Sequence, residues 1–197
     1  MLIKSLMFFV CGGFGWTFSE YALHNWYGHK AKGKNEFSRE HLSHHTDTTY
    51  FAANWKKALA TIKLSPLIFI LMSYLSGLFY GSIFTFGFLI TYLTYEILHR
   101  RIHTHEPKNF YSRFIRKHHA YHHFSNPRYN HGVTSPIWDI IFRTYKKSEI
   151  IRVPENNAMK WLFDKNGSIK HEYKKDYELI LKIISSQKTV EPLEIIG

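Results

Sequence analysis

The sequence predicts an all-α fold in which integral membrane helices carry a helical cap on the cytoplasmic side. Residues 64–95 contain no Lys, Arg, Asp, Glu or His, and this run exceeds the roughly 18 apolar residues that indicate a membrane span. Residues 1–23 are also apolar, with only Lys4 and Glu20 charged. Ten of the 14 histidines form short clusters beside these stretches, at spacings typical of helices.

The composition narrows the class of protein. With 45% hydrophobic and 21% charged residues, the 197-residue chain is expected to form one domain rather than a disordered tail. The single cysteine, Cys11, excludes an internal disulfide framework and a thiolate zinc site. A net charge of +11 indicates an anionic partner. We find no nucleic-acid motif and expect no nucleic acid, because basic segments beside membrane spans suit anionic lipid.

Residues 1–23 are interpreted as an uncleaved membrane helix. The alternative is a signal peptide, but no cleavage site of small residues precedes the bulky Trp16. The stretch also continues directly into the first histidine motif, which favours its retention.

Residues 64–98 are interpreted as a membrane hairpin. As one helix, the charge-free run would be about 48 Å long, against about 30 Å of hydrocarbon. Gly77 and Gly81 suit a break, and Pro66 suits the start of the first helix. The pattern therefore predicts two helices, at 64–78 and 82–98. The alternative is a buried hairpin in the core of a soluble protein.

The basic residues indicate the orientation. Apart from Lys4, 25 of the 26 lie in 30–63 and 100–188, and the expected turn at 77–81 has none. By the positive-inside rule, both polar segments face the cytoplasm. The expected organisation is a single domain over 1–197, with a membrane helix at 1–23, a membrane hairpin at 64–98, a histidine-bearing cap from 24–63 and 99–145, and a polar C-terminal extension at 146–197.

Within that extension, the sequence KKDYELILKIISSQ (174–187) predicts an amphipathic helix.

The ten clustered histidines form four groups: His24 and His29; His41, His44 and His45; His99 and His103; and His119, His122 and His123. Spacings of three and four place side chains on one helical face. The first pair is five residues apart, about 140° around a helix, so we expect it where the first span ends or distorts. For His45 and His99 to meet, the hairpin must enter and return on the same membrane face.

Four imidazole clusters predict a metal centre. Imidazole suits Zn, Cu, Fe and Ni, and ten ligands in four clusters suggest two ions. Metal-bound histidine usually donates its other ring nitrogen to a carboxylate or carbonyl. Glu20 and Glu96 have the spacing to supply this to His24 and His99, although either could make an ordinary contact. Two other histidines are expected near the site, His118 and His131, whereas His105 and His171 are expected outside it.

The sequence resembles the fatty acid hydroxylase/sterol desaturase superfamily of membrane di-metal oxygenases. The matching elements, in family order, are EYALHNWYGH, HLSHH, YEILHRRIH, HHAYHH and NHGVTSPIWDIIFRTY. The resemblance implies two iron ions (zinc being possible in the purified protein), O2 as co-substrate, and hydroxylation or desaturation of a lipid. It assigns ligand roles to His24, His29, His41, His44, His45, His99, His103, His119, His122 and His123.

The GVTSPIWD segment is most similar to that of fatty acid 2-hydroxylases, so hydroxylation of a lipid acyl chain is the expected activity. Arg143 stands where a glycine is usual, and TDTT replaces a Pro-x-Asp element, which leaves sterol or carotenoid substrates as alternatives. The cytochrome-type domain of many relatives is not encoded. We therefore expect a separate electron donor, ferredoxin- or cytochrome-like, with its reductase.

The GVTSPIWD segment itself predicts a turn that docks on the site. Gly132 and Pro136 suit the turn, and Ser135 or Asp139 could cap the following helix. Trp138 is expected to pack rather than to contact substrate.

Two functions of other classes are alternatives: a histidine-rich metal transporter and a membrane-anchored zinc protein. Transporter ligands should lie near the membrane midplane, yet of the 14 histidines only His99 borders the predicted hairpin and none lies within it. Iron content together with an O2-dependent product would separate these alternatives.

Overall fold

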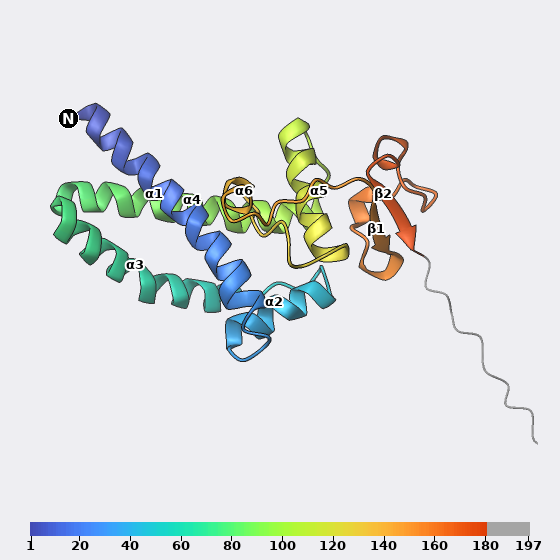
Figure 1. The fold of residues 1–197 in the computed structure, drawn as a ribbon, viewed down its shortest axis with the longest axis horizontal. Coiled ribbons are helices and arrows are strands. Elements are labelled where there is room, and N and C mark those ends of the chain that lie inside the picture. The colour runs from blue at the N-terminus through green and yellow to red at the C-terminus, as the bar shows by residue number, and fades with distance from the viewer. Residues whose placement is uncertain (181–197) are drawn as a thin grey trace, which may run out of the picture.

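The computed structural model describes residues 1–180 and is built mainly of helices (Figure 1). Three segments are long and apolar enough to cross a membrane: α1 (Leu2–Ala22) with the π-helix that continues it (Leu23–His29), α3 (Asn54–Ser76) and α4 (Leu78–Thr104). The prediction of an all-α membrane fold is confirmed, with the addition of one two-stranded sheet.

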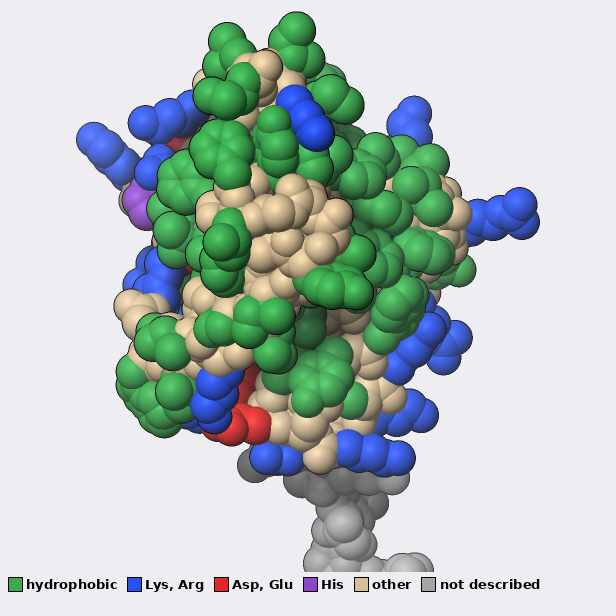
Figure 2. All heavy atoms as spheres, turned by 90° about the vertical axis from the view of Figure 1, so that its left-hand side faces the viewer, with side chains coloured by type: hydrophobic (Ala, Val, Ile, Leu, Met, Phe, Trp, Pro, Cys, Tyr) green, Lys and Arg blue, Asp and Glu red, His purple; other side chains and the backbone are tan. Residues whose placement is uncertain are grey.

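Helices α1 and α4 cross in direct backbone contact (Figure 1). A Cβ on Gly12 would lie 2.0 Å from the carbonyl oxygen of Phe84, and one on Gly87 would lie 2.1 Å from that of Phe9. Small residues permit such close approach between membrane helices. Viewed from the end that holds the N-terminus and the α3–α4 turn, the near surface is mostly hydrophobic or uncharged, with basic side chains at its edges (Figure 2).

The hairpin turns at Gly77, whose φ of +82° is accessible mainly to glycine. The prediction that Pro66 begins a helix is wrong, because α3 begins at Asn54 and Pro66 lies inside it. Ion pairs stabilise the first turn of α3, before Pro66. Lys56 lies 2.9 Å from Glu36 and 2.5 Å from Glu40, and Lys57 pairs with Glu96 of α4.

Helices α2 (Glu36–Thr46) and α5 (Phe110–Phe124) form the cap, at the ends of the long helices that lie away from the N-terminus (Figure 1). The side chain of Asn35 accepts a hydrogen bond from the Ser38 amide and caps α2. Asn109 and Ser112 form a reciprocal capping box at the start of α5. Short α6 (Ile137–Ile141) follows and lies against α1.

The C-terminal part of the described chain packs on α5. Strands β1 (Ile151–Pro154) and β2 (Tyr177–Ile180) pair in parallel, and three short 3-10 helices lie between them at Glu155–Asn157, Lys160–Leu162 and His171–Tyr173. The prediction of an amphipathic helix at 174–187 is wrong over 177–180, which form β2, while 181–187 lie outside the described residues. Tyr177 is buried in a cluster with Trp161, Leu162 and Ala120 of α5, and this tertiary contact overrides the helical pattern.

Candidate metal centre

The first histidine pair lies on the π-helix at the end of α1. A π-helix closes hydrogen bonds between residues five apart, so His24 and His29 are brought over one another, with ring centroids 5.4 Å apart. The expectation that this pair lies where the first span distorts is confirmed.

The ten clustered histidines meet in two groups of five. The first group contains His24, His29, His41, His45 and His122; the second contains His44, His99, His103, His119 and His123. In each group, one ring nitrogen per residue lies within 4.8 Å of all the others. Helices α2 and α5 each contribute to both groups, whereas the π-helix serves only the first and α4 only the second.

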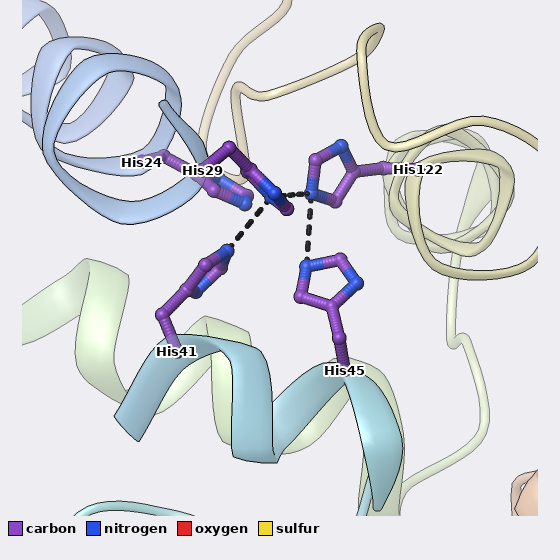
Figure 3. A group of neighbouring side chains, drawn as sticks. All are labelled: His24, His29, His41, His45 and His122. Atoms are coloured by element: carbon purple, nitrogen blue, oxygen red, sulfur yellow. Dashed lines mark hydrogen bonds between the residues drawn. The ribbon is translucent and has the colours of Figure 1, made fainter. Parts of the chain in front are cut away.

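The rings of the first group converge on a common centre (Figure 3). The Nε2 atom of His29 lies 2.8 Å from that of His41 and 2.9 Å from that of His122, which is 3.1 Å from that of His45. A neutral imidazole nitrogen carries either one proton or one lone pair. It therefore cannot satisfy two such neighbours at once, whereas a cation at the centre would accept every lone pair.

The second group repeats this arrangement. The Nε2 atom of His103 lies 3.2 Å from that of His44 and 3.0 Å from that of His119, which is 3.0 Å from that of His123. Within residues 1–180, the buried Nε2 atoms of His24 and His99 have no hydrogen-bond partner. Buried polar atoms are rarely left unpaired, so these two nitrogens also point to an ion.

Backbone carbonyls fix the tautomers of three histidines. The Nδ1 atoms of His24, His44 and His122 lie 2.5, 2.8 and 2.7 Å from carbonyl oxygens. These oxygens belong to residues His131, Tyr50 and Tyr129, respectively. A carbonyl can only accept, so each Nδ1 carries the proton and each Nε2 keeps its lone pair for a metal. The sequence offers Glu20 and Glu96 as partners by their helical spacing, whereas these three carbonyls cannot be identified from spacing.

Burial keeps the cap histidines neutral. It lowers the pKa of His44 to about 4 and, together with the charge of neighbouring histidines, the pKa of His45 to about 2. The pKa values of His119, His122 and His123 are held well below the usual range for the same reasons. Neutral imidazole is the form that binds metal. The all-nitrogen donor sets therefore fit two borderline transition-metal ions such as iron or zinc.

The two predicted carboxylate partners make other contacts. Glu20 accepts hydrogen bonds from the backbone of Val133 and from the Thr134 amide (2.9 Å) and hydroxyl (2.6 Å). Glu96 pairs with Lys57. Among the described residues, neither carboxylate bonds a histidine. Helical spacing brings the side chains near one another, but it does not fix which partners the carboxylate oxygens bind.

Asp139 is the buried carboxylate that supports this region. It accepts hydrogen bonds from the amides of His131 (2.8 Å) and Gly132 (2.7 Å) and from the Thr144 hydroxyl (2.7 Å), and it lies 3.3 Å from Nε2 of His118. Burial raises its pKa, but hydrogen bonds from His118 and His131 outweigh this and hold the pKa below its usual value. Asp139 thus closes a turn rather than capping α6.

The remaining predicted residues fall outside the two groups. His118 and His131 contact Asp139, and His105 and His171 contribute to neither group. Trp138 packs against Phe14, as expected. The sequence did not predict Phe51 as a neighbour of the site. Its ring lies 5.1 Å from that of His44, beneath the guanidinium of Arg100.

Comparisons with known proteins agree with this arrangement. The chain is 28% identical to mouse (Mus musculus) fatty acid 2-hydroxylase over 69% of its own length and 38% of that protein. It is 29% identical to a dihydroceramide fatty acyl 2-hydroxylase of Arabidopsis thaliana, over 68% of this chain and 59% of that one. A solved structure of full-length scs7p, in which only the hydroxylase domain is visible, matches with a TM-score of 0.59 and 28% identity, over 74% of this chain and 57% of that one.

The chain thus spans less than two thirds of the length of each of these relatives. The family model for fatty acid hydroxylases matches residues 9–144, which include both histidine groups and the turn held by Asp139. The resemblance of the sequence motifs is confirmed: the chain belongs to the fatty acid hydroxylase family.

Proposed function

We propose that the chain is a membrane-bound, non-haem di-iron oxygenase that hydroxylates a lipid acyl chain with O2 and externally supplied electrons. The observation that carries this proposal is the pair of five-imidazole groups at the cap end of three membrane-spanning helices. The names of the mouse and Arabidopsis relatives support an acyl-chain substrate hydroxylated at position 2.

Iron bound by the ten histidines would supply the O2 chemistry, which requires a redox-active ion and is beyond zinc. The residues of this chain hold that centre in place: three backbone carbonyls orient His24, His44 and His122, and Asp139 fixes the turn that carries the carbonyl of His131. Because His24 and His99 lie near the ends of their spans, an acyl chain would reach the centre with carbons near its headgroup.

The cap is proposed to face the cytoplasm, where a ferredoxin- or cytochrome-like donor with its reductase would supply electrons. The basic residues of the cap support this orientation. A sterol or carotenoid substrate would use the same centre. A metal transporter is disfavoured because both groups lie at the ends of the spans rather than midway along them.

The test is turnover under labelled oxygen gas. The iron-loaded protein, reconstituted with reductase and ferredoxin, should place label in a hydroxy-acyl product. His122→Ala should lose the product and bind less metal, whereas the control His171→Ala, outside both groups, should retain both properties. An unlabelled double bond would mean desaturation. A labelled sterol or carotenoid beside unlabelled acyl chains would refute the substrate, and iron-loaded protein without any oxidised product would refute the oxygenase.

A further inference from the structure

The surface of residues 137–142, which are α6 and the residue after it, is apolar although the segment lies outside the three long helices. Ile140 is 59% exposed, Ile141 54% and Phe142 41%. The one charged residue of the segment, Asp139, is fully buried. A contiguous apolar patch of this kind marks a surface that contacts something other than water.

This patch continues the lipid-facing surface of α1. The indole of Trp138 lies 4.9 Å from the rings of both Phe14 and Phe18, and its Nε1 donates a 2.9 Å hydrogen bond to Thr17. The ring of Phe142 extends the same cluster to Phe18, at 6.4 Å. Phe14 is itself 46% exposed on a membrane-spanning helix, so exposed apolar side chains of α1 lie beside those of α6.

The depth of these contacts places α6 within the membrane boundary. Helix α1 has 21 residues and is therefore about 32 Å long, which matches the roughly 30 Å thickness of the hydrocarbon. At about 1.5 Å per residue, Phe18 lies about 6 Å and Phe14 about 12 Å before its end at Ala22. Because Trp138 packs on both rings, α6 lies beside the last turns of α1 rather than above them.

The backbone of the segment suits an apolar environment. The amides of Ile140, Phe142 and Arg143 donate to the carbonyls of Pro136, Trp138 and Ile140 at 3.0, 2.9 and 3.2 Å, respectively. Satisfied backbone groups are a requirement for lipid contact. The exposed Arg143 then turns the chain with a φ of +58°, and exposed Lys146 and Lys147 follow. Basic residues at the edge of an apolar, aromatic patch are typical of the interface with lipid headgroups.

We infer that residues 137–142 are immersed in the bilayer interface beside α1, with lipid acyl chains as the contact of Ile140, Ile141 and Phe142. The turn that Asp139 closes would then be held from two sides, by α1 and by lipid. This inference does not depend on the reaction or on the identity of the metal.

Site-directed spin labelling tests the inference in phospholipid vesicles. Cys11→Ser removes the single cysteine, and Ile140→Cys then carries the label. The matched control is Ile150→Cys, which is similarly exposed at 54% but lies before β1, away from α1. We expect the ratio of O2 to nickel-chelate accessibility to be several-fold higher at 140 than at 150. Equal ratios would overturn the inference, as would a label at 140 shielded from both reagents by protein.

A second measurement uses the unmodified protein and so avoids any folding defect of the variants. Vesicles containing a phospholipid with a photoactivatable acyl chain should cross-link to the tryptic peptide 129–143, as well as to peptides of α3. The peptide 153–160 serves as the control and should remain unmodified. Cross-linked α3 peptides with an unmodified 129–143 peptide would contradict the lipid contact.

Discussion

Each histidine of α2 is directed by its position on a helix that turns about 100° per residue. His41 and His45 are four residues apart and face the first group, whereas His44 is rotated by about 100° from His45 and faces the second. The same division separates His122 from His119 and His123 on α5. A single stripe of imidazoles therefore supplies two metal positions.

Asp139→Asn should loosen the turn beside the first group. The carboxylate accepts from two backbone amides and the Thr144 hydroxyl, and the amide group of asparagine would set a donor against one of these donors. An unsatisfied buried group costs about 1–3 kcal/mol, so we expect a lower melting temperature and weaker metal retention, because the carbonyl of His131 orients His24. Thermal unfolding in detergent and elemental analysis measure both. The exposed Glu155→Gln should change neither, and an unaltered Asp139→Asn protein would contradict the proposed role.

At this scale, the sequence predicted which ten histidines assemble but not their division or their supporting groups. Helical spacing alone places His41, His44 and His45 on one face. The positions of the neighbouring helices determine which of these rings joins the first group and which joins the second. The carbonyl that orients His24 belongs to a residue 107 positions away. Such partners are brought together by the tertiary fold, and the spacing of nearby residues does not identify them.

Among the elements, the contact between α1 and α4 depends most on residue size. Gly87→Ala would place a Cβ 2.1 Å from the backbone carbonyl of Phe9, which cannot move without separating the helices. We expect a loss of about 1–3 kcal/mol, typical of overpacking, measured by thermal unfolding in detergent. Gly15→Ala is the matched control, because its Cβ would meet side-chain rings rather than backbone, that of Phe84 at 3.2 Å and that of Phe88 at 3.7 Å. Equal melting temperatures for the two variants would refute the close backbone contact.

The elements also show where pattern analysis fails. The apolar composition of α1, α3 and α4 indicates membrane helices, because an uncharged run as long as residues 64–95 is rare in the core of a soluble protein. By contrast, YELI at 177–180 fits either a helix or a strand, and its pairing with Ile151 and burial against α5 select the strand. The early start of α3 likewise depends on ion pairs with α2 and α4.

Across the whole molecule, Asp176 ties the C-terminal segment to the cap, 2.7 Å from Arg113 and 2.9 Å from Lys117 of α5. Burial raises the pKa of Asp176, but hydrogen bonds from Lys117 and Arg113 outweigh this, so the folded-state pKa is below the usual value. The stabilisation is therefore full above the unfolded pKa of about 4 and is lost as the pH falls through the folded value.

Asp176→Asn should accordingly lower the melting temperature at pH 7, and the difference from the unsubstituted protein should shrink as the pH falls below about 4. Thermal unfolding across this pH range measures it. The control is Glu178→Gln, which removes an exposed partner of Arg152 and should have little effect. A difference that does not vary with pH would contradict the charge-dependent contact.

The orientation of the molecule is testable with one cysteine at a time. In the Cys11→Ser background, Ile150→Cys should react with a membrane-impermeant maleimide only after cells are permeabilised, because the basic cap is proposed to face the cytoplasm. Leu2→Cys, at the opposite end of the molecule and 83% exposed, should react in intact cells. The reverse pattern would place the cap outside.

The sharing of α2 and α5 between both histidine groups has a consequence for how the centre is assembled. To bind one group, an ion must order helices α2 and α5. These same helices carry half or more of the ligands of the other group. The second ion then meets a site whose conformational entropy has already been lost, which is the condition for positive cooperativity without further structural change. Titration of the apoprotein should therefore yield mixtures of empty and doubly loaded chains, with singly loaded chains scarce.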